Sequence, residues 1–168
     1  MNLTQPQIMR TASQCLAELR ELGYQPPIAV QYRVSSRLTR ALGNCLEQRQ
    51  MGKIVRLVIT ISADVPSETL KDVMMHELIH AVVGGREHHG YKFQALANLV
   101  NRTYGYRVGT YASTEEREAI QKVRAQKSNF STVKCLKCGN EHVMSNRAGV
   151  VKHPERYGCK CGGRLEII

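Results

Sequence analysis

Apolar residues near the start of the chain recur with the period of a helix. Between Thr4 and Leu22 they fall three or four positions apart, which predicts a helix with one buried face. Thr4 and Gln7 have the spacing of a capping box, and Gly23 suits the position after the helix end. The residues of the predicted apolar face are Ile8, Ala12, Cys15, Leu16, Leu19 and Leu22.

An alternating pattern follows and predicts a small sheet. Residues 28–34 alternate between apolar and polar side chains, as in a half-buried strand. Residues 40–48 are a candidate second strand. Residues 53–62 carry apolar side chains on both faces, which predicts an interior strand.

Helical spacing returns after this third strand. Asp64 and Ser67 are candidate N-caps with Pro66 between them, and the helix should end at Gly84 and Gly85. Two further helices are predicted, one ending near residue 104 and one running from a capping box at residues 113–116 to about residue 126. We therefore expect an α+β fold with helices packed on a three-stranded sheet.

One short run within the predicted central helix contains candidate metal ligands and a candidate catalytic residue. His76 and His80 are four residues apart, so both side chains lie on one helical face and can bind one metal ion. Glu77 completes the H-E-x-x-H pattern of zinc hydrolases, in which the glutamate is the general base. A metzincin would need glycine at position 83 and histidine at 86, but Val83 and Arg86 stand there and exclude that class.

A catalytic zinc ion normally takes a third protein ligand and leaves its fourth position to water. We favour His89, because it opens a new helix after a short loop and is followed by Gly90, which permits a close turn. His88, Glu87 and Cys45 are the alternatives. Cys45 as the ligand would indicate a deformylase-like amidase.

After residue 127 the composition shifts towards cysteine, glycine and lysine. Two close cysteine pairs in so short a segment predict a structural zinc site, whose metal would supply the folding energy. The second pair is C-x-C rather than C-x-x-C, so His142 and His153 stay open as substitutes for one cysteine. The four predicted ligands are Cys135, Cys138, Cys159 and Cys161.

The formal net charge of +10 is spread over both parts of the chain. This balance favours polyanionic partners such as DNA or RNA, although a basic surface that binds nothing would have the same composition. The sequence shows no secretory signal and no apolar run near the ~20 residues of a membrane span. We expect a cytoplasmic or nucleoid-associated protein with no membrane partner, whose cysteines bind metal rather than form disulfides.

Taken together, these motifs resemble the SprT-like zinc metalloprotease family, which includes Spartan. The matching segments are Arg40-Ala41-Leu42-Gly43, residues 76–80, residues 89–93 and the C-terminal cysteines. The resemblance implies a minimal zincin-like metalloprotease domain over residues 1–127, followed by a zinc ribbon over residues 128–168.

The resemblance further implies an endopeptidase with one catalytic and one structural Zn²⁺ ion, acting as a monomer on DNA-bound or DNA-crosslinked proteins. Its DNA partner would be single-stranded or damaged duplex DNA. His76, His80 and His89 would bind the catalytic ion and Glu77 would be the general base. The alternatives are a DNA- or protein-binding zinc protein with weak or no proteolysis, and the amidase.

No second oxyanion donor is evident in the sequence. Tyr91, Tyr104 and Tyr106 lie close to the predicted site along the chain. We expect each of them to pack at the edge of the core.

Overall fold

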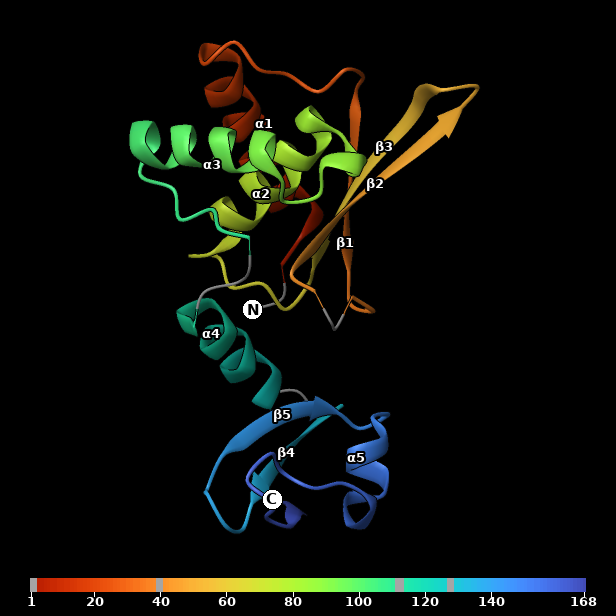
Figure 1. Ribbon diagram of the computed structural model, residues 1–168, viewed down its shortest axis with the longest axis vertical. Coiled ribbons are helices and arrows are strands. Elements are labelled where there is room, and N and C mark those ends of the chain that lie inside the picture. Colours follow the sequence, from red (N-terminus) through yellow and green to blue (C-terminus); the bar gives the residue numbers. More distant parts are fainter. Residues whose placement is uncertain (1–2, 39–40, 111–113, 127–128) are drawn as a thin grey trace. The chain divides into compact units, whose positions relative to one another are not determined.

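The computed structural model describes residues 3–38, 41–110, 114–126 and 129–168. The chain divides into two units, Met1–Ser113 and Thr114–Ile168. Each unit contains a three-stranded sheet and at least one helix, so the fold is α+β, as the sequence predicts (Figure 1).

The sheet of the first unit consists of β1 (Val30–Ser35), β2 (Gly43–Gln50) and β3 (Lys53–Ser62). β3 lies in the centre, parallel to β1 and antiparallel to β2. The prediction of an interior strand is therefore confirmed. Residue 40, the predicted start of the second strand, lies outside the described residues. One face of β3 buries Leu57, Ile59 and Ile61 in the core.

Three helices lie on one side of this sheet: α1 (Gln5–Glu21) and α2 (Leu70–Val83) pack against its strands, and α3 (Tyr91–Tyr104) packs on α2 (Figure 1). At the start of α1, Gln7 Oε1 accepts a hydrogen bond from the Thr4 N–H at 2.8 Å. Gly23 follows the helix end with φ +83°, a left-handed conformation that favours glycine. Both ends of α1 agree with the sequence prediction.

The predicted start of α2 is wrong. The helix begins at Leu70 with Thr69 as its N-cap, rather than at Asp64 or Ser67. The reason is a turn before the helix, in which the Pro66 carbonyl accepts hydrogen bonds from both the Thr69 N–H and the Thr69 hydroxyl at 3.2 Å.

α2 is the central element of the first unit, because it contacts α1, α3, β2 and β3. It is buried on more than one face, unlike α1 and α3, which each bury a single stripe. The buried residues of α2 are Leu70, Val73, Met74, Met75, Glu77, Leu78, Ile79 and Ala81.

The second unit contains α4 (Thr114–Ala125), β4 (Phe130–Cys135), β5 (Glu141–Ser145), α5 (Gly149–Lys152) and β6 (Leu165–Ile167). Its antiparallel sheet has the order β5-β4-β6, and α4 contacts β4 and β5. The capping serine predicted for α4, Ser113, lies outside the described residues.

Within the part of the chain that the structure describes, no helix combines the length and the apolar character needed to cross a membrane.

Candidate metal centres

Three histidines of the first unit meet at one point. His76 and His80 lie one turn apart on α2, and His89 precedes α3 by two residues. The Nε2 atoms are 3.2 Å apart between His76 and His80, and 3.1 Å apart between His89 and each of the other two. The structure thus joins the H-E-x-x-H histidines with the third histidine that we favoured from the sequence.

The loop that carries His89 is fixed at both ends by carboxylates. Glu47 of β2 accepts a hydrogen bond from the Gly85 N–H at 3.1 Å, just after α2 ends. Glu87 accepts one from the Lys92 N–H at 2.8 Å, in the first turn of α3. These two contacts hold the loop against β2 and the start of α3, and so set the position of His89.

The structure leaves the alternative third ligands outside the cluster. His88 is exposed. The carboxylate of Glu87 binds the start of α3. Cys45 does not belong to the histidine cluster, and burial raises the pKa of its thiol to about 12, which disfavours the thiolate that binds metal.

Phe93 of α3 packs against all three imidazoles. Its ring centroid lies 4.9 Å from that of His76, 4.6 Å from His80 and 4.8 Å from His89, and the side chain is fully buried. Burial in these surroundings lowers the pKa of both His76 and His80 to about 4. Both imidazoles are therefore neutral at pH 7, which is the form that binds metal.

The three Nε2 atoms are better placed to bind a zinc ion than to form hydrogen bonds with one another. Each neutral Nε2 atom is either a donor or an acceptor, so among three atoms in mutual contact at least one pair must have the same role. A shared cation removes this conflict. Three nitrogens bound tetrahedrally to zinc at about 2.0–2.1 Å would stand roughly 3.3 Å apart, close to the separations seen here.

Glu77 lies on α2 next to His76 and is only 6% exposed. Burial raises the pKa of its carboxyl to about 8. The carboxyl is not a member of the histidine cluster, which leaves it available for a role other than metal ligation. Its side chain lies directly against Gly43 of β2, where an added methyl group would stand 2.7 Å from Glu77 Cγ and Oε1.

The expectation for the tyrosines is wrong for Tyr91. Its side chain is 86% exposed at the start of α3 and does not pack at the core edge. Tyr104 and Tyr106 pack with the core as expected, and both hydroxyl groups bind residues of α1.

A segment that lies beside α2 was missed at the level of the sequence. Asp72 Oδ1, one turn before His76, accepts a hydrogen bond from the Arg107 N–H at 2.9 Å, in the segment that follows α3. The alternation of buried Tyr106 and Val108 with exposed neighbours indicates an extended segment there, but the sequence contains no signal that places it against α2.

The second unit brings together the four predicted cysteines. The Sγ atoms of Cys135 and Cys161 are 3.5 Å apart, those of Cys138 and Cys159 are 3.6 Å apart, and all four lie within 4.8 Å of one another. Four sulfurs bound tetrahedrally to zinc at about 2.3 Å would be roughly 3.8 Å apart, so the cluster fits zinc. Neither His142 nor His153 belongs to it.

The short spacing of the second cysteine pair is accommodated by a tight turn. The Gly162 N–H donates to the Cys159 carbonyl at 2.8 Å, and Gly162 has φ +78°. A methyl group on Gly163 would lie 2.6 Å from Cys135 Sγ, so the turn also requires a residue without a side chain there. These glycines allow the C-x-C pair, Cys159 and Cys161, to lie against the first cysteine pair, Cys135 and Cys138.

Comparison with known proteins agrees with this geometry. No curated protein matches the chain. The model of the SprT-like family matches residues 12–116, which is more than half of the chain and includes all three clustered histidines and Glu77. This family is metalloprotease-like, and both clusters of the structure fit zinc. The chain belongs to the SprT-like family.

Proposed function

We propose that this protein is a zinc-dependent endopeptidase that acts on proteins bound or crosslinked to DNA. The observation that carries the peptidase activity is the meeting of three Nε2 atoms within 3.2 Å, with the buried carboxyl of Glu77 on the same helix as two of them. Membership of the SprT-like family supports the same reaction class.

When bound, zinc would polarise the scissile carbonyl and lower the pKa of the attacking water. His76, His80 and His89 would hold the ion as neutral imidazoles. Glu77 would take the proton of the attacking water on a carboxylate oxygen and deliver it to the leaving amine. Burial alone favours the protonated carboxyl, and the positive charge of a bound zinc ion would favour the carboxylate that accepts this proton.

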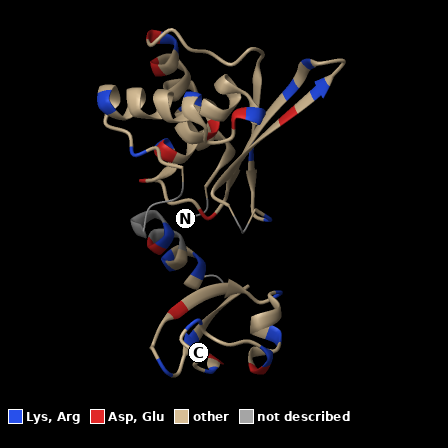
Figure 2. Cartoon of the chain, viewed as in Figure 1, with Lys and Arg blue, Asp and Glu red and all other residues tan. Residues whose placement is uncertain are grey.

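The proposed action near DNA is supported by charge. The net charge is +10, and Figure 2 shows that both units contain lysine and arginine residues. In the second unit these include Lys134, Lys137, Lys152, Lys160 and Arg164. Such side chains bind phosphates without reading the base sequence, which suits a peptidase that must act wherever a protein is attached to DNA.

The test is cleavage of a DNA-binding protein by the wild type and by Glu77→Gln, without DNA and with single-stranded or duplex DNA. We expect Glu77→Gln to lose about 10²–10⁴-fold in rate while zinc binding is retained, because only the proton acceptor is removed. Rates should rise with DNA. Glu68→Gln is the matched control, since Glu68 is exposed and lies before α2.

Each part of the proposal can be refuted by a different result. Wild-type turnover by Glu77→Gln would refute the general base. Equal cleavage with and without DNA would remove the DNA component and leave the peptidase. A zinc-loaded wild type that binds DNA but cleaves no protein would establish the alternative, a zinc protein that binds without proteolysis.

A further inference from the structure

The three clustered histidines are supported by the chain in two different ways. His76 and His80 lie on α2, where the helical backbone alone places them on one face. His89 lies outside any helix or strand, in the turn that joins α2 to α3. The position of the third histidine therefore depends on the contacts that hold this turn.

The backbone of the turn does not hold itself. His88, directly before His89, has φ +48° and ψ −120°. A residue with a side chain disfavours this conformation, and it persists only where surrounding contacts maintain it. Among the residues that the structure describes, the other non-glycine residue with a positive φ is Met51, in the turn between β2 and β3. Contacts that hold the turn at His88 should therefore be found on either side of it.

Glu87 holds the turn from the side before His89. Its carbonyl accepts a hydrogen bond from the Gly90 N–H at 2.9 Å, and its Oε1 accepts one from the Lys92 N–H at 2.8 Å. Gly90 is the N-cap of α3 and has no side chain to bind the first helical N–H groups, so Glu87 takes over that role. A methyl group on Gly90 would lie 2.6 Å from Glu87 Oε1, which explains the glycine.

Gln94 holds the turn from the side of α3. Its Nε2 donates a hydrogen bond to the His89 carbonyl at 2.9 Å, and its backbone N–H donates to the Gly90 carbonyl at 3.0 Å. Glu87 thus reaches forward to the helix, and Gln94 reaches back from the helix to His89 itself. We call these two side chains the clasp.

The clasp and the packing of the ring act on the same residue. The His89 imidazole lies with its centroid 4.8 Å from that of Phe93, which is fully buried on the first turn of α3. The backbone of His89 is bound by Gln94, one position further along the same helix. With both its backbone and its ring fixed to α3, His89 places Nε2 3.1 Å from the Nε2 atoms of His76 and His80.

We propose that Glu87 and Gln94 are positioning residues, which present His89 to the two histidines of α2 before a metal ion binds. The inference rests on the proposed function insofar as the cluster binds zinc. Glu87 is not a member of the histidine cluster, and Gln94 binds the His89 carbonyl rather than the ring. Both therefore act through the backbone of the turn, as supports that pre-organise a metal site do.

The decisive variant is Gln94→Ala, in full-length protein with ¹⁵N-labelled histidine rings. Gln94 is exposed, so the change should not prevent folding. Zinc affinity is measured by competition with chelators and followed on the ring signals of the three histidines, to which the four cysteines do not contribute. We expect it to fall about 10-fold, as for other lost outer partners of metal ligands.

A second readout uses metal-free protein. The proton contact between the rings of His89 and Phe93, measured as a nuclear Overhauser effect, should weaken in Gln94→Ala. The contact between His80 and Phe93, whose ring centroids are 4.6 Å apart, should be retained, because His80 is held by α2. A purely structural role of Gln94 would not change one of these contacts and spare the other.

The other half of the clasp is tested by a pair of variants at one position. Glu87→Ala removes the acceptor of the Lys92 N–H and should shift both readouts as Gln94→Ala does. Glu87→Gln keeps an oxygen acceptor there and should retain the wild-type values. Asn98→Ala is the matched control, because Asn98 is exposed one turn later on α3 and should change neither readout.

The proposal is overturned if zinc affinity in Gln94→Ala and Glu87→Ala stays within about twofold of the wild type, even if the melting temperature falls. Equal weakening of the His89 and His80 contacts with Phe93 would also overturn it, since the effect would then not be specific to the turn. A wild-type cluster that binds no zinc would instead refute the proposed function, and the ring contacts in metal-free protein would still decide the inference.

Discussion

At the scale of single residues, the proposed base depends on the absence of a side chain opposite it. Gly43 at the start of β2 lies so close to Glu77 that a methyl group would stand 2.7 Å from Cγ and Oε1. Contact with the backbone of β2 thereby limits the positions open to the Glu77 carboxyl. Gly43 also lies in one of the segments that carry the family resemblance. The close approach of the Glu77 side chain is a physical reason for glycine at this position.

We predict that Gly43→Ala displaces the Glu77 carboxyl and lowers the peptidase rate by at least about 10-fold, with overpacking costing about 1–3 kcal/mol in stability. Zinc content should not change, because the three atoms nearest to the new methyl group all belong to Glu77, which is not a member of the histidine cluster. Rate, zinc content and melting temperature check this. The control is Gly158→Ala, where a methyl group meets no atom within 4 Å. Unchanged activity in Gly43→Ala would contradict the prediction.

Some residues of the site were predictable and others were not, for a physical reason. His76 and His80 follow from helical spacing, because neighbours four apart share a face, and Glu77 follows from the H-E-x-x-H pattern. The choice between His88 and His89 depends on the backbone, which places His88 at φ +48° and turns it to solvent. No pattern in the sequence indicates that Asp72 of α2 binds the backbone of Arg107.

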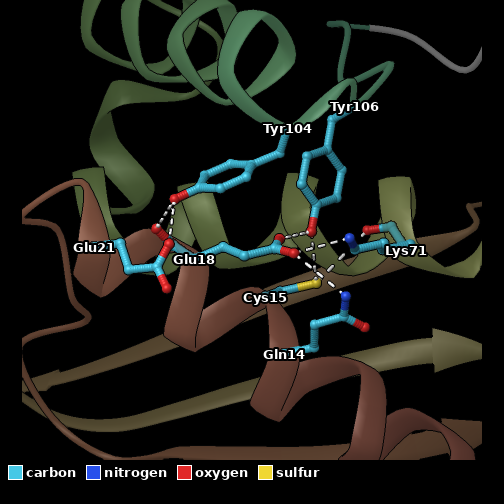
Figure 3. Close-up of polar contacts among 7 residues, drawn as sticks. All are labelled: Gln14, Cys15, Glu18, Glu21, Lys71, Tyr104 and Tyr106. Atoms are coloured by element: carbon cyan, nitrogen blue, oxygen red, sulfur yellow. Dashed lines mark hydrogen bonds and ion pairs between the residues drawn. The ribbon is translucent and has the colours of Figure 1, made fainter.

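At the scale of elements, a polar network joins α1, α2 and Tyr106, which follows α3. Glu18 is its centre, since it binds Tyr106, Lys71 and Gln14 (Figure 3). Burial raises the pKa of the neighbouring Cys15 thiol to about 11, so this cysteine stays protonated beside the carboxylate. The network therefore holds one negative charge, matched by the ammonium of Lys71.

We predict that Glu18→Gln lowers the free energy of unfolding by about 1–3 kcal/mol at neutral pH, through weaker bonds to Tyr106 and Lys71. The folded-state pKa of Glu18 is lowered, so its contribution is present above the ordinary carboxyl pKa of about 4.3 and is lost as the pH falls through the folded value. Denaturant unfolding of both proteins from about pH 7 to pH 3 checks this. A stability difference that stays constant over that range would be contrary to it.

Elements with a single buried stripe were predicted well. α1 and α3 each bury one face, and their periodicity is visible in the sequence. The start of α2 was not predictable from Asp64 and Ser67, because a turn closed by Pro66 and Thr69 delays the helix. The packing of the segment after α3 was missed because the partner of Tyr106 lies 88 residues earlier in the chain.

At the scale of the whole molecule, the two units are stabilised in different ways. The first has a continuous apolar core built from α1, α2, α3 and β3. In the second, the buried apolar residues among those described are Phe130, Val133 and Cys135. A cluster of four cysteines takes the place of a larger core, and zinc bound there would supply most of the folding energy.

We predict that a strong chelator unfolds the second unit and leaves the first folded. Structural zinc contributes about 10–16 kcal/mol to small domains of this kind, which the few buried side chains cannot replace. Hydrogen exchange should show loss of protection in β4 and β5 and retention in α1 and β3. Restoring zinc should restore protection. Loss of protection in both units together, or in neither, would contradict this division.

The burial of α2 has a consequence for how the sequence tolerates change. Eight of its 14 residues are buried, the others are half-buried and none is exposed, and the metal-binding motif lies inside this run. A random-substitution screen would therefore find an almost unbroken intolerant stretch over α2 and a periodic pattern over α3. Within that stretch, hydrophobic replacements would separate two kinds of residue. At Met75 and Ile79 they should keep both folding and activity. At His76 and His80 they should keep folding but not activity.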